Sequence, residues 1–356
     1  MKKYNSILAG FLHNYPSYLI FFVTARCNSK CRMCFYWKEI EKAKNKKELS
    51  IKEIEKITKH FKTLPYVSLG GGEPFLRQDI DKICCLFYKN CNARFINIPT
   101  NGILTSTISA KAKNILEKCP EAQLNIDLSI DGIGRLHDKI RGVKGNFEMA
   151  MKTYQELDKL RKKFPNLSIN VLTVFSTYNQ DKISEIIDYI KRNLDVNSHR
   201  IGLARTDSRE QKAKEVSIQQ YKKCIDILNR TKKASRGFFA RILRGVYETS
   251  AEIAYKTGKN NRACLQCVAG KKLIVMSEEG NIYPCELLSK KIGNIRDYDY
   301  DIGKLLSSKT AKETRKFIKE TKCFCTWECG IMNSLFFNPK FYPKILKNAL
   351  KQAKTK

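Results

Sequence analysis

Three cysteines near the start of the chain have a spacing that suits a metal cluster. Cys27, Cys31 and Cys34 form a C-x3-C-x2-C pattern directly after an apolar run, so three thiols share one short loop. A structural zinc site usually takes four protein ligands, whereas an iron-sulfur cubane held by three thiolates leaves one iron open to a substrate or cofactor. The pattern therefore predicts a three-thiolate [4Fe-4S] cluster. A zinc knuckle with a distant fourth ligand, or thiols that share no role, are the alternatives.

A second group of cysteines lies toward the C-terminus. Cys267 and Cys285 belong to a C-x12-G-x4-C arrangement, in which Gly280 turns a hairpin and returns the second thiol beside the first. The full group is Cys264, Cys267, Cys285, Cys323, Cys325 and Cys329. Four of these thiols are expected to hold a second metal centre. From the residues alone, that centre is either an iron-sulfur cluster or a zinc ribbon.

The remaining thiols are interpreted as structural. A chain of 356 residues with 14 cysteines can build a large core without disulfides, so the cysteines are expected to be reduced. Five of them lie in or beside helical patterns, where a free thiol packs as a small apolar side chain. They are Cys84, Cys85, Cys91, Cys119 and Cys224.

The N-terminus superficially resembles a secretory signal, because two lysines precede an apolar segment that ends at Ala25. His13, Asn14 and Pro16 interrupt the apolar run, and cleavage after Ala25 would place the first cysteine group in an oxidising compartment. We therefore predict a cytoplasmic protein.

The charge balance is strongly basic. Lys and Arg number 67 against 35 Asp and Glu, which gives a net charge of +32. Such a charge attracts nucleic acid, anionic lipid or acidic substrates, although a lysine-rich surface also serves solubility. Because the sequence carries no recognised nucleic-acid-binding motif, no specific nucleic-acid partner is predicted.

The elements that position the first cysteine group alternate between strands and helices. Six β-branched or aromatic runs are predicted as strands, at residues 18–24, 66–69, 94–99, 124–130, 167–175 and 200–204. Amphipathic stretches separate them, and the clearest begins at Ser50, where Glu53 completes a capping box. The alternation predicts an α/β fold, a partial (βα)6 TIM-like barrel with its chemistry at the C-terminal ends of parallel strands.

The predicted domain order places the barrel first and a small cysteine-rich, metal-stapled domain after it. Residues 1–17 form an N-terminal segment, 18–205 the barrel, 206–260 a helical linker, 261–335 the cysteine-rich domain with a hairpin of strands 273–276 and 282–285, and 336–356 a basic tail. The tail interleaves apolar residues with lysines. It is expected to dock on the protein or fray, with peripheral contact to an anionic membrane as the alternative.

With its cysteine motif after the first strand of a partial barrel, the chain resembles the radical SAM superfamily. Further matches follow successive strands: Gly71-Gly72-Glu73-Pro74 resembles the family's GGEP motif, and Thr100, Asn101, Ser129 and Asp131 end the third and fourth strands. The resemblance implies that the cysteine cluster binds S-adenosylmethionine. It also implies that Glu73 contacts the methionine ammonium, that the polar residues contact the ribose, and that Arg141 pairs with the methionine carboxylate. His137 is interpreted as a loop histidine satisfied by its neighbours.

The C-terminal cysteines resemble the SPASM and Twitch extensions of this superfamily, which hold auxiliary [4Fe-4S] clusters. The chain departs from a full SPASM module because only C-x-C-x3-C remains of its middle motif and no cysteine follows Cys329. One auxiliary cluster is therefore favoured. By analogy its ligands would be Cys264, Cys267, Cys285 and Cys329, with Cys323 and Cys325 as alternates or part of a second site.

The resemblance implies an enzyme that cleaves S-adenosylmethionine reductively and abstracts a hydrogen atom from its substrate. The first hypothesis is a small or anionic metabolite as substrate, with electrons from a donor such as flavodoxin or ferredoxin. A peptide or protein maturase is the second, although the 17 residues before Tyr18 are too few for a separate peptide-recognition domain. A non-enzymatic iron-sulfur sensor or nucleic-acid-binding protein is the third. No catalytic acid or base is assigned.

Overall fold

The computed structural model describes the backbone of residues 13, 15–205, 207–231 and 238–351. The predicted N-terminal segment lies mostly outside these residues. Within the described part, six strands form a parallel series in which each pairs with the next: β1 (Tyr18–Thr24), β2 (Tyr66–Gly71), β3 (Phe95–Thr100), β4 (Gln123–Ser129), β5 (Leu167–Phe175) and β6 (Ser198–Leu203). The six predicted strands are confirmed, with end points that differ by at most two residues.

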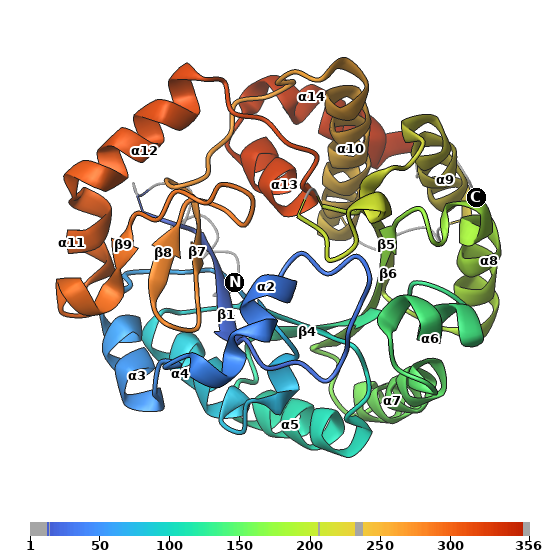
Figure 1. Ribbon diagram of the computed structural model, residues 1–356, viewed down its shortest axis with the longest axis horizontal. Coiled ribbons are helices and arrows are strands. Elements are labelled where there is room, and N and C mark those ends of the chain that lie inside the picture. Colours follow the sequence, from blue (N-terminus) through green and yellow to red (C-terminus); the bar gives the residue numbers. More distant parts are fainter. Residues whose placement is uncertain (1–12, 14, 206, 232–237, 352–356) are drawn as a thin grey trace.

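The helices between the strands cover the outer face of this sheet (Figure 1). They are α3 (Ile51–His60), α4 (Ile80–Asn90), α5 (Thr105–Lys118), α7 (Asn146–Arg161) and α8 (Ile183–Asn193), and two short helices, α2 (Trp37–Glu41) and α6 (Arg135–Arg141), follow β1 and β4. The capping box at the start of α3 is confirmed, because Ser50 accepts from the Glu53 backbone and Glu53 accepts from the Ser50 backbone. The core of buried Ile, Leu and Phe side chains lies between sheet and helices.

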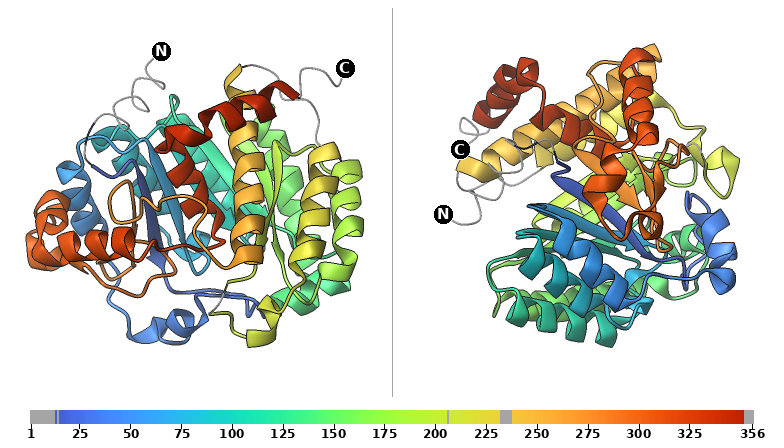
Figure 2. Two further views of the ribbon diagram at one scale, coloured as in Figure 1. Left: turned by 90° about the horizontal axis from the view of Figure 1, so that it is seen from above. Right: turned by 90° about the vertical axis from the view of Figure 1, so that its left-hand side faces the viewer.

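The C-terminal part begins with two helices, α9 (Ile218–Thr231) and α10 (Phe238–Asn260), as predicted for the linker. It continues through β7 (Leu273–Met276), β8 (Asn281–Tyr283), β9 (Gly293–Asn294), α11 (Ile302–Ser307), α12 (Lys309–Glu320), α13 (Glu328–Phe336) and α14 (Tyr342–Lys351). Figure 2 shows α10, α13 and α14 across the side of the sheet opposite α4 and α5, whereas α11 lies beside α3 and α9 beside α8 (Figure 1). The C-terminal part therefore covers the side of the open sheet that the helices between the strands leave uncovered.

The C-terminal hairpin does not form a separate sheet. Strand β7 pairs in parallel with β1, from Tyr18 opposite Leu273 to Phe21 opposite Met276, and the sheet continues through β8 and β9. The free edge of β1 offers unpaired backbone groups, and pairing with β7 satisfies them. The predicted boundary near residue 261 therefore divides the chain by sequence but does not divide the sheet.

The predicted basic tail docks on the protein as far as it is described. Asn348 on α14 donates to Thr249 Oγ1 on α10 at 3.1 Å, and Gly245 leaves room for the backbone of Ile345, whose oxygen would lie 2.4 Å from a Cβ there. Residues 352–356 of the tail lie outside the described part. Among the described helices, none combines the length and apolar character that crossing a membrane requires.

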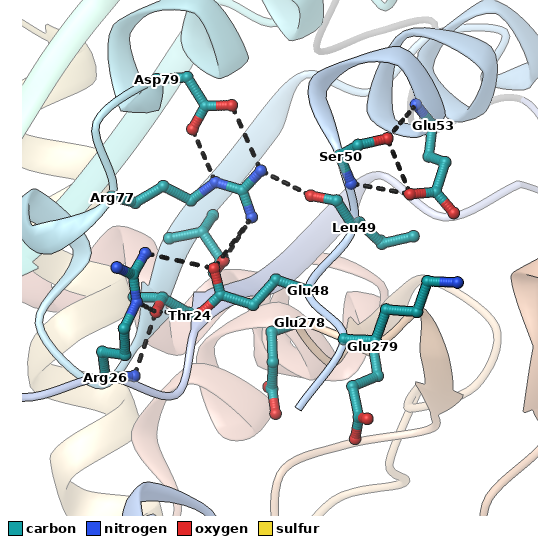
Figure 3. Close-up of polar contacts among 12 residues, drawn as sticks. Thr24, Arg26, Glu48, Leu49, Ser50, Glu53, Arg77, Asp79, Glu278 and Glu279 are labelled. Carbon is teal, nitrogen blue, oxygen red and sulfur yellow. Dashed lines mark hydrogen bonds and ion pairs between the residues drawn. The ribbon is translucent and has the colours of Figure 1, made fainter. Parts of the chain in front are cut away.

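One buried arginine joins three segments near the end of β1 (Figure 3). Arg77 is 5% exposed, and its guanidinium donates to Val23 O at 2.7 Å, to Leu49 O at 2.6 Å and to Asp79 Oδ1 at 2.8 Å. The contacts connect the end of β1, the segment before α3 and the turn after β2. Since two buried carbonyls depend on one side chain, the loop after β1 is anchored by Arg77.

Replacing Arg77 with methionine is expected to destabilise the protein by roughly 2 to 5 kcal/mol, because it leaves buried carbonyls and a carboxylate without their donor. The matched control is Arg26→Met, which removes a half-exposed guanidinium 3.3 Å from Glu48 and should cost about 1 kcal/mol or less. Urea denaturation monitored by circular dichroism measures both. Equal losses in the two variants would show that Arg77 is not an anchor.

Candidate active site

A single cavity collects both groups of cysteines. Its volume is about 680 Å³, and its lining includes the first group, Cys27, Cys31 and Cys34. All six C-terminal cysteines also line it. Of the predicted cofactor-binding residues, the lining includes Gly71, Gly72, Glu73, Thr100, Asn101, Ser129 and Arg141. Two predicted positions, Pro74 and Asp131, do not line the cavity.

The two glycines of the GGEP motif let the cysteine loop pack against β2. A Cβ on Gly71, whose φ is +110°, would lie 2.3 Å from Thr24 O, and one on Gly72 would lie 2.1 Å from Arg26 O. Hydrogen bonds from Gly72 N to Thr24 O (2.8 Å) and from Glu73 N to Arg26 O (2.9 Å) join the same segments. The glycines thus permit close approach of the protein backbone.

Glu73 connects the second and third strands at the cavity wall. Its buried carboxylate accepts from Thr100 Oγ1 at 2.9 Å, from Asn101 N at 2.8 Å and from Phe75 N at 3.2 Å. Burial raises the pKa of Glu73 to about 7, although these hydrogen bonds favour the charged form. A cation brought beside this carboxylate would stabilise its ionised state.

Asn101 holds the cysteine loop in place. Its side-chain nitrogen donates to Asn28 Oδ1 at 2.7 Å and to Ser29 Oγ at 3.0 Å, two residues between the first and second cysteines. The Asn101 side chain therefore serves the loop directly, a function that sequence reasoning missed. An Asn-Gly turn gives no signal for a partner more than seventy residues away.

Asp131 departs from its predicted ribose contact, because its fully buried carboxylate is used within the protein. One oxygen accepts from Val174 N at 2.7 Å, and the other accepts from Arg141 Nε at 2.6 Å. His137 lies on helix α6 and is also buried, where its Nδ1 accepts from Asp131 N at 3.1 Å. Burial lowers the pKa of His137 to about 4, as expected for a neutral structural histidine. Pro74 begins the short 3-10 turn after Glu73.

Five of the six C-terminal cysteines pack against one apolar cluster, and Cys264 packs against another; the five are Cys267, Cys285, Cys323, Cys325 and Cys329. Burial, together with nearby Cys267, Cys285 and Cys323, raises the pKa of Cys325 to about 12. The pKa of Cys285 is likewise raised by burial and then by Cys267, and its Sγ accepts from Leu288 N at 3.3 Å. Within this cluster, four thiols affect one another's pKa, namely those of Cys267, Cys285, Cys323 and Cys325.

Cys329 lies next to Tyr18 of strand β1. Burial raises the pKa of Tyr18 well above its usual value, and Cys329, which hydrogen-bonds to it, raises it further. Burial and the nearby Glu286 raise the pKa of the Cys329 thiol, whereas Arg205 and Arg200 lower it. The ligand set expected by analogy was Cys264, Cys267, Cys285 and Cys329, with Cys323 and Cys325 as alternates or part of a second site, and all six thiols line the cavity.

The separation of the cysteines bears on the kind of metal they could hold. Within the described residues, no three His, Cys, Asp or Glu side chains are placed so that they could share one metal ion. A cubane offers a separate iron to each thiolate, so its ligands need not converge on a single point. Both cysteine groups therefore remain candidates for clusters on the basis of their donor type and their place in one cavity.

Two ion pairs inside the cavity were not found from the sequence. Arg200 on β6 pairs with buried Asp127 on β4, and Arg205 pairs with Glu286, whose side chain is 7% exposed and which follows Cys285. The Arg205 guanidinium also lies 3.8 Å from the centre of the Phe35 ring. The sequence did carry a signal for the first pair, because Asp127 and Arg200 are charged residues within otherwise apolar strands. Such side chains must face a polar interior.

The open parallel barrel and the cysteine loop after its first strand define a class of cofactor-dependent enzyme. Residues 21–190 match the model of the Radical SAM superfamily. The chain belongs to this superfamily, and it is a radical SAM enzyme. The family implies S-adenosylmethionine and a [4Fe-4S] cluster as cofactors.

Similar proteins support the assignment over most of the chain. "AdoMet-dependent heme synthase" of Methanosarcina barkeri (strain Fusaro / DSM 804) is 27% identical over 303 residues, which are 81% of each chain. A structure of "anSMEcpe with bound AdoMet" has a TM-score of 0.61 at 18% identity and covers 95% of this chain and 97% of its own. Streptococcus suis SuiB bound to precursor peptide SuiA has a TM-score of 0.60 at 18% identity, covering 94% and 74%. The shared fold thus includes the C-terminal SPASM/Twitch-like extension.

Proposed function

We propose that this chain abstracts a hydrogen atom from a small anionic substrate held between two iron-sulfur clusters. The observation that carries the proposal is the single cavity lined by Cys27, Cys31 and Cys34 and by the C-terminal cysteines. In this superfamily the bound cluster and S-adenosylmethionine together supply a 5'-deoxyadenosyl radical after reduction by a donor such as flavodoxin or ferredoxin. The protein's own groups bind, orient and enclose the reactants.

Glu73 and Arg141 would hold the amino-acid end of the cofactor. Both side chains line the cavity, one from the end of β2 and the other from the end of α6. Glu73 offers a carboxylate to an ammonium, and Arg141 keeps guanidinium donors beyond those that it gives to Asp131 and Cys31. Thr100 and Ser129 supply the hydroxyls proposed for the ribose, while Asn101 acts mainly on the loop.

The auxiliary cluster would be held by Cys267, Cys285, Cys323 and Cys325, the four thiols that influence one another's pKa. The hydrogen bond from Leu288 N to Cys285 Sγ fits a thiolate ligand, because backbone amides commonly surround cluster sulfurs. Cys329 would remain a thiol in the cavity beside Tyr18. Zinc at the same four thiols is the alternative that metal analysis decides.

The arginines of the cavity favour an anionic substrate. Arg200 and Arg205 each form an ion pair with one carboxylate, and a guanidinium carries five N–H donors. Both side chains line the cavity, so the remaining donors are available to a carboxylate or phosphate group. The aromatic rings of Phe35 and Trp327 near Arg205 would enclose the apolar part of such a molecule.

Replacing Glu73 with glutamine is expected to weaken S-adenosylmethionine binding about ten- to hundred-fold, because the contact to the ammonium loses its charge, worth roughly 1.5 to 3 kcal/mol. Equilibrium binding to anaerobically reconstituted protein of matched iron content measures this loss. Glu117→Gln, an exposed change on α5, is the control. If Glu73→Gln binds as tightly as the control, Glu73 does not contact the cofactor.

Product analysis tests the proposed substrate class. Reconstituted, reduced protein would be incubated with S-adenosylmethionine and either anionic metabolites or peptides encoded near its gene, and products identified by mass spectrometry. Substrate-dependent 5'-deoxyadenosine with a modified metabolite is the expected result, and Arg205→Leu should raise KM for that metabolite. Modification of a peptide alone would instead show that the chain is a maturase.

A further inference from the structure

The guanidinium of Arg141 lies directly against a predicted cluster ligand. Its Nη1 donates to Cys31 Sγ at 3.7 Å, and its Nε donates to Asp131 Oδ2 at 2.6 Å. Asp131 is itself fixed, because it is fully buried and its second oxygen accepts from Val174 N at 2.7 Å. The cation is therefore held beside the sulfur by a carboxylate that has no freedom to move away.

The backbone around Arg141 is joined to the same loop on both sides of Cys31. Lys30 N donates to Arg141 O at 3.1 Å, and Arg32 N donates to Ile140 O at 3.0 Å. The chain then turns at Gly142, whose φ is +68°, and a Cβ there would lie 2.7 Å from Lys30 O. The end of α6 thus holds the cysteine loop through backbone contacts that are independent of the side-chain contact.

We propose that Arg141 is a positioning residue that raises the reduction potential of the cluster held by Cys27, Cys31 and Cys34, through its hydrogen bond to Cys31 Sγ. The inference rests on the proposed function only in requiring that this cluster forms. Hydrogen bonds to cluster sulfurs and nearby charge are established determinants of potential. Reduction adds negative charge, so a buried cation that donates to the sulfur stabilises the reduced cluster more than the oxidised one.

Redox titration followed by electron paramagnetic resonance, without S-adenosylmethionine, tests this role separately from cofactor binding. Arg141→Met should lower the reduction equilibrium constant at least tenfold, which corresponds to about 59 mV for a one-electron couple. Arg135→Met is the matched control, because it removes an exposed arginine from the same helix and should leave the potential unchanged. Equal potentials in the wild type and Arg141→Met would overturn the inference.

A second variant tests the same inference if Arg141→Met does not fold. Arg141→Lys keeps a cation but loses the planar fork, so we expect a smaller shift in the same direction and loss of the exchangeable-proton coupling that electron-nuclear double resonance detects at the cluster. Wild-type coupling and potential in Arg141→Lys would contradict the inference. If the wild-type protein itself binds no cluster after reconstitution, the proposed function fails instead.

Discussion

Replacing Cys27, Cys31 and Cys34 together with alanine is expected to abolish cleavage of S-adenosylmethionine and to remove about four irons per chain. The three thiols share one loop and one cavity wall, and no other cysteine within the described residues follows β1 as closely. Without them the cluster has no ligands at the point where the cofactor must bind. Iron analysis and chromatography of 5'-deoxyadenosine measure the two losses.

A second triple cysteine variant serves as the control, because it shows whether losing any three cysteines has the same effect as losing the three in this motif. The triple variant of Cys85, Cys119 and Cys224 to alanine removes three thiols that pack on or beside helices α4, α5 and α9. It should keep its iron and its activity. Cleavage that persists at the wild-type rate in the Cys27, Cys31 and Cys34 variant would remove the assignment of the cluster to this loop.

Replacing Cys285 with alanine is expected to lower iron from about eight to about four per chain and to lower the melting temperature by several degrees. A cluster at Cys267, Cys285, Cys323 and Cys325 would connect the hairpin of β7 and β8 with a segment more than thirty residues later. Its binding energy therefore contributes to folding. Iron and sulfide analysis and calorimetry of anaerobic protein measure both effects.

Cys329→Ala distinguishes the two ligand sets. In the proposed ligand set Cys329 stays a thiol beside Tyr18, so the variant should keep about eight irons, whereas Cys325→Ala should lose about four. The opposite pattern would restore the ligand set expected by analogy with SPASM. About four irons with one zinc in the wild type would show that the second site is a zinc ribbon.

The sequence predicted the parts of this molecule that local patterns determine. The strands Tyr18–Thr24 and Leu167–Phe175 were predicted with the observed bounds, because short apolar and β-branched runs between amphipathic helices have few other interpretations. The cysteine loop was found for a similar reason, since its three thiols are neighbours in sequence. Fold class and superfamily follow from such short-range signals.

Contacts between distant segments could not be predicted in the same way. The pairing of Tyr18 with Leu273 joins residues 255 positions apart, and nothing in the sequence of either strand indicates which strand it pairs with. The same holds for which of the six C-terminal cysteines would bind one cluster, because this depends on how the segment after α12 returns to the hairpin. Asp131 was predicted to contact the ribose, because the sequence does not show that Arg141 lies beside it. The two side chains come together only when α6 folds.

Anaerobic incubation of the reconstituted, reduced wild-type protein with S-adenosylmethionine tests whether the cluster at Cys27, Cys31 and Cys34 cleaves this cofactor. We expect 5'-deoxyadenosine and methionine in equal amounts, formed only when the reductant is present and lost in the Cys27, Cys31 and Cys34 variant. Protein that holds about eight irons yet leaves S-adenosylmethionine intact under these conditions would contradict this expectation.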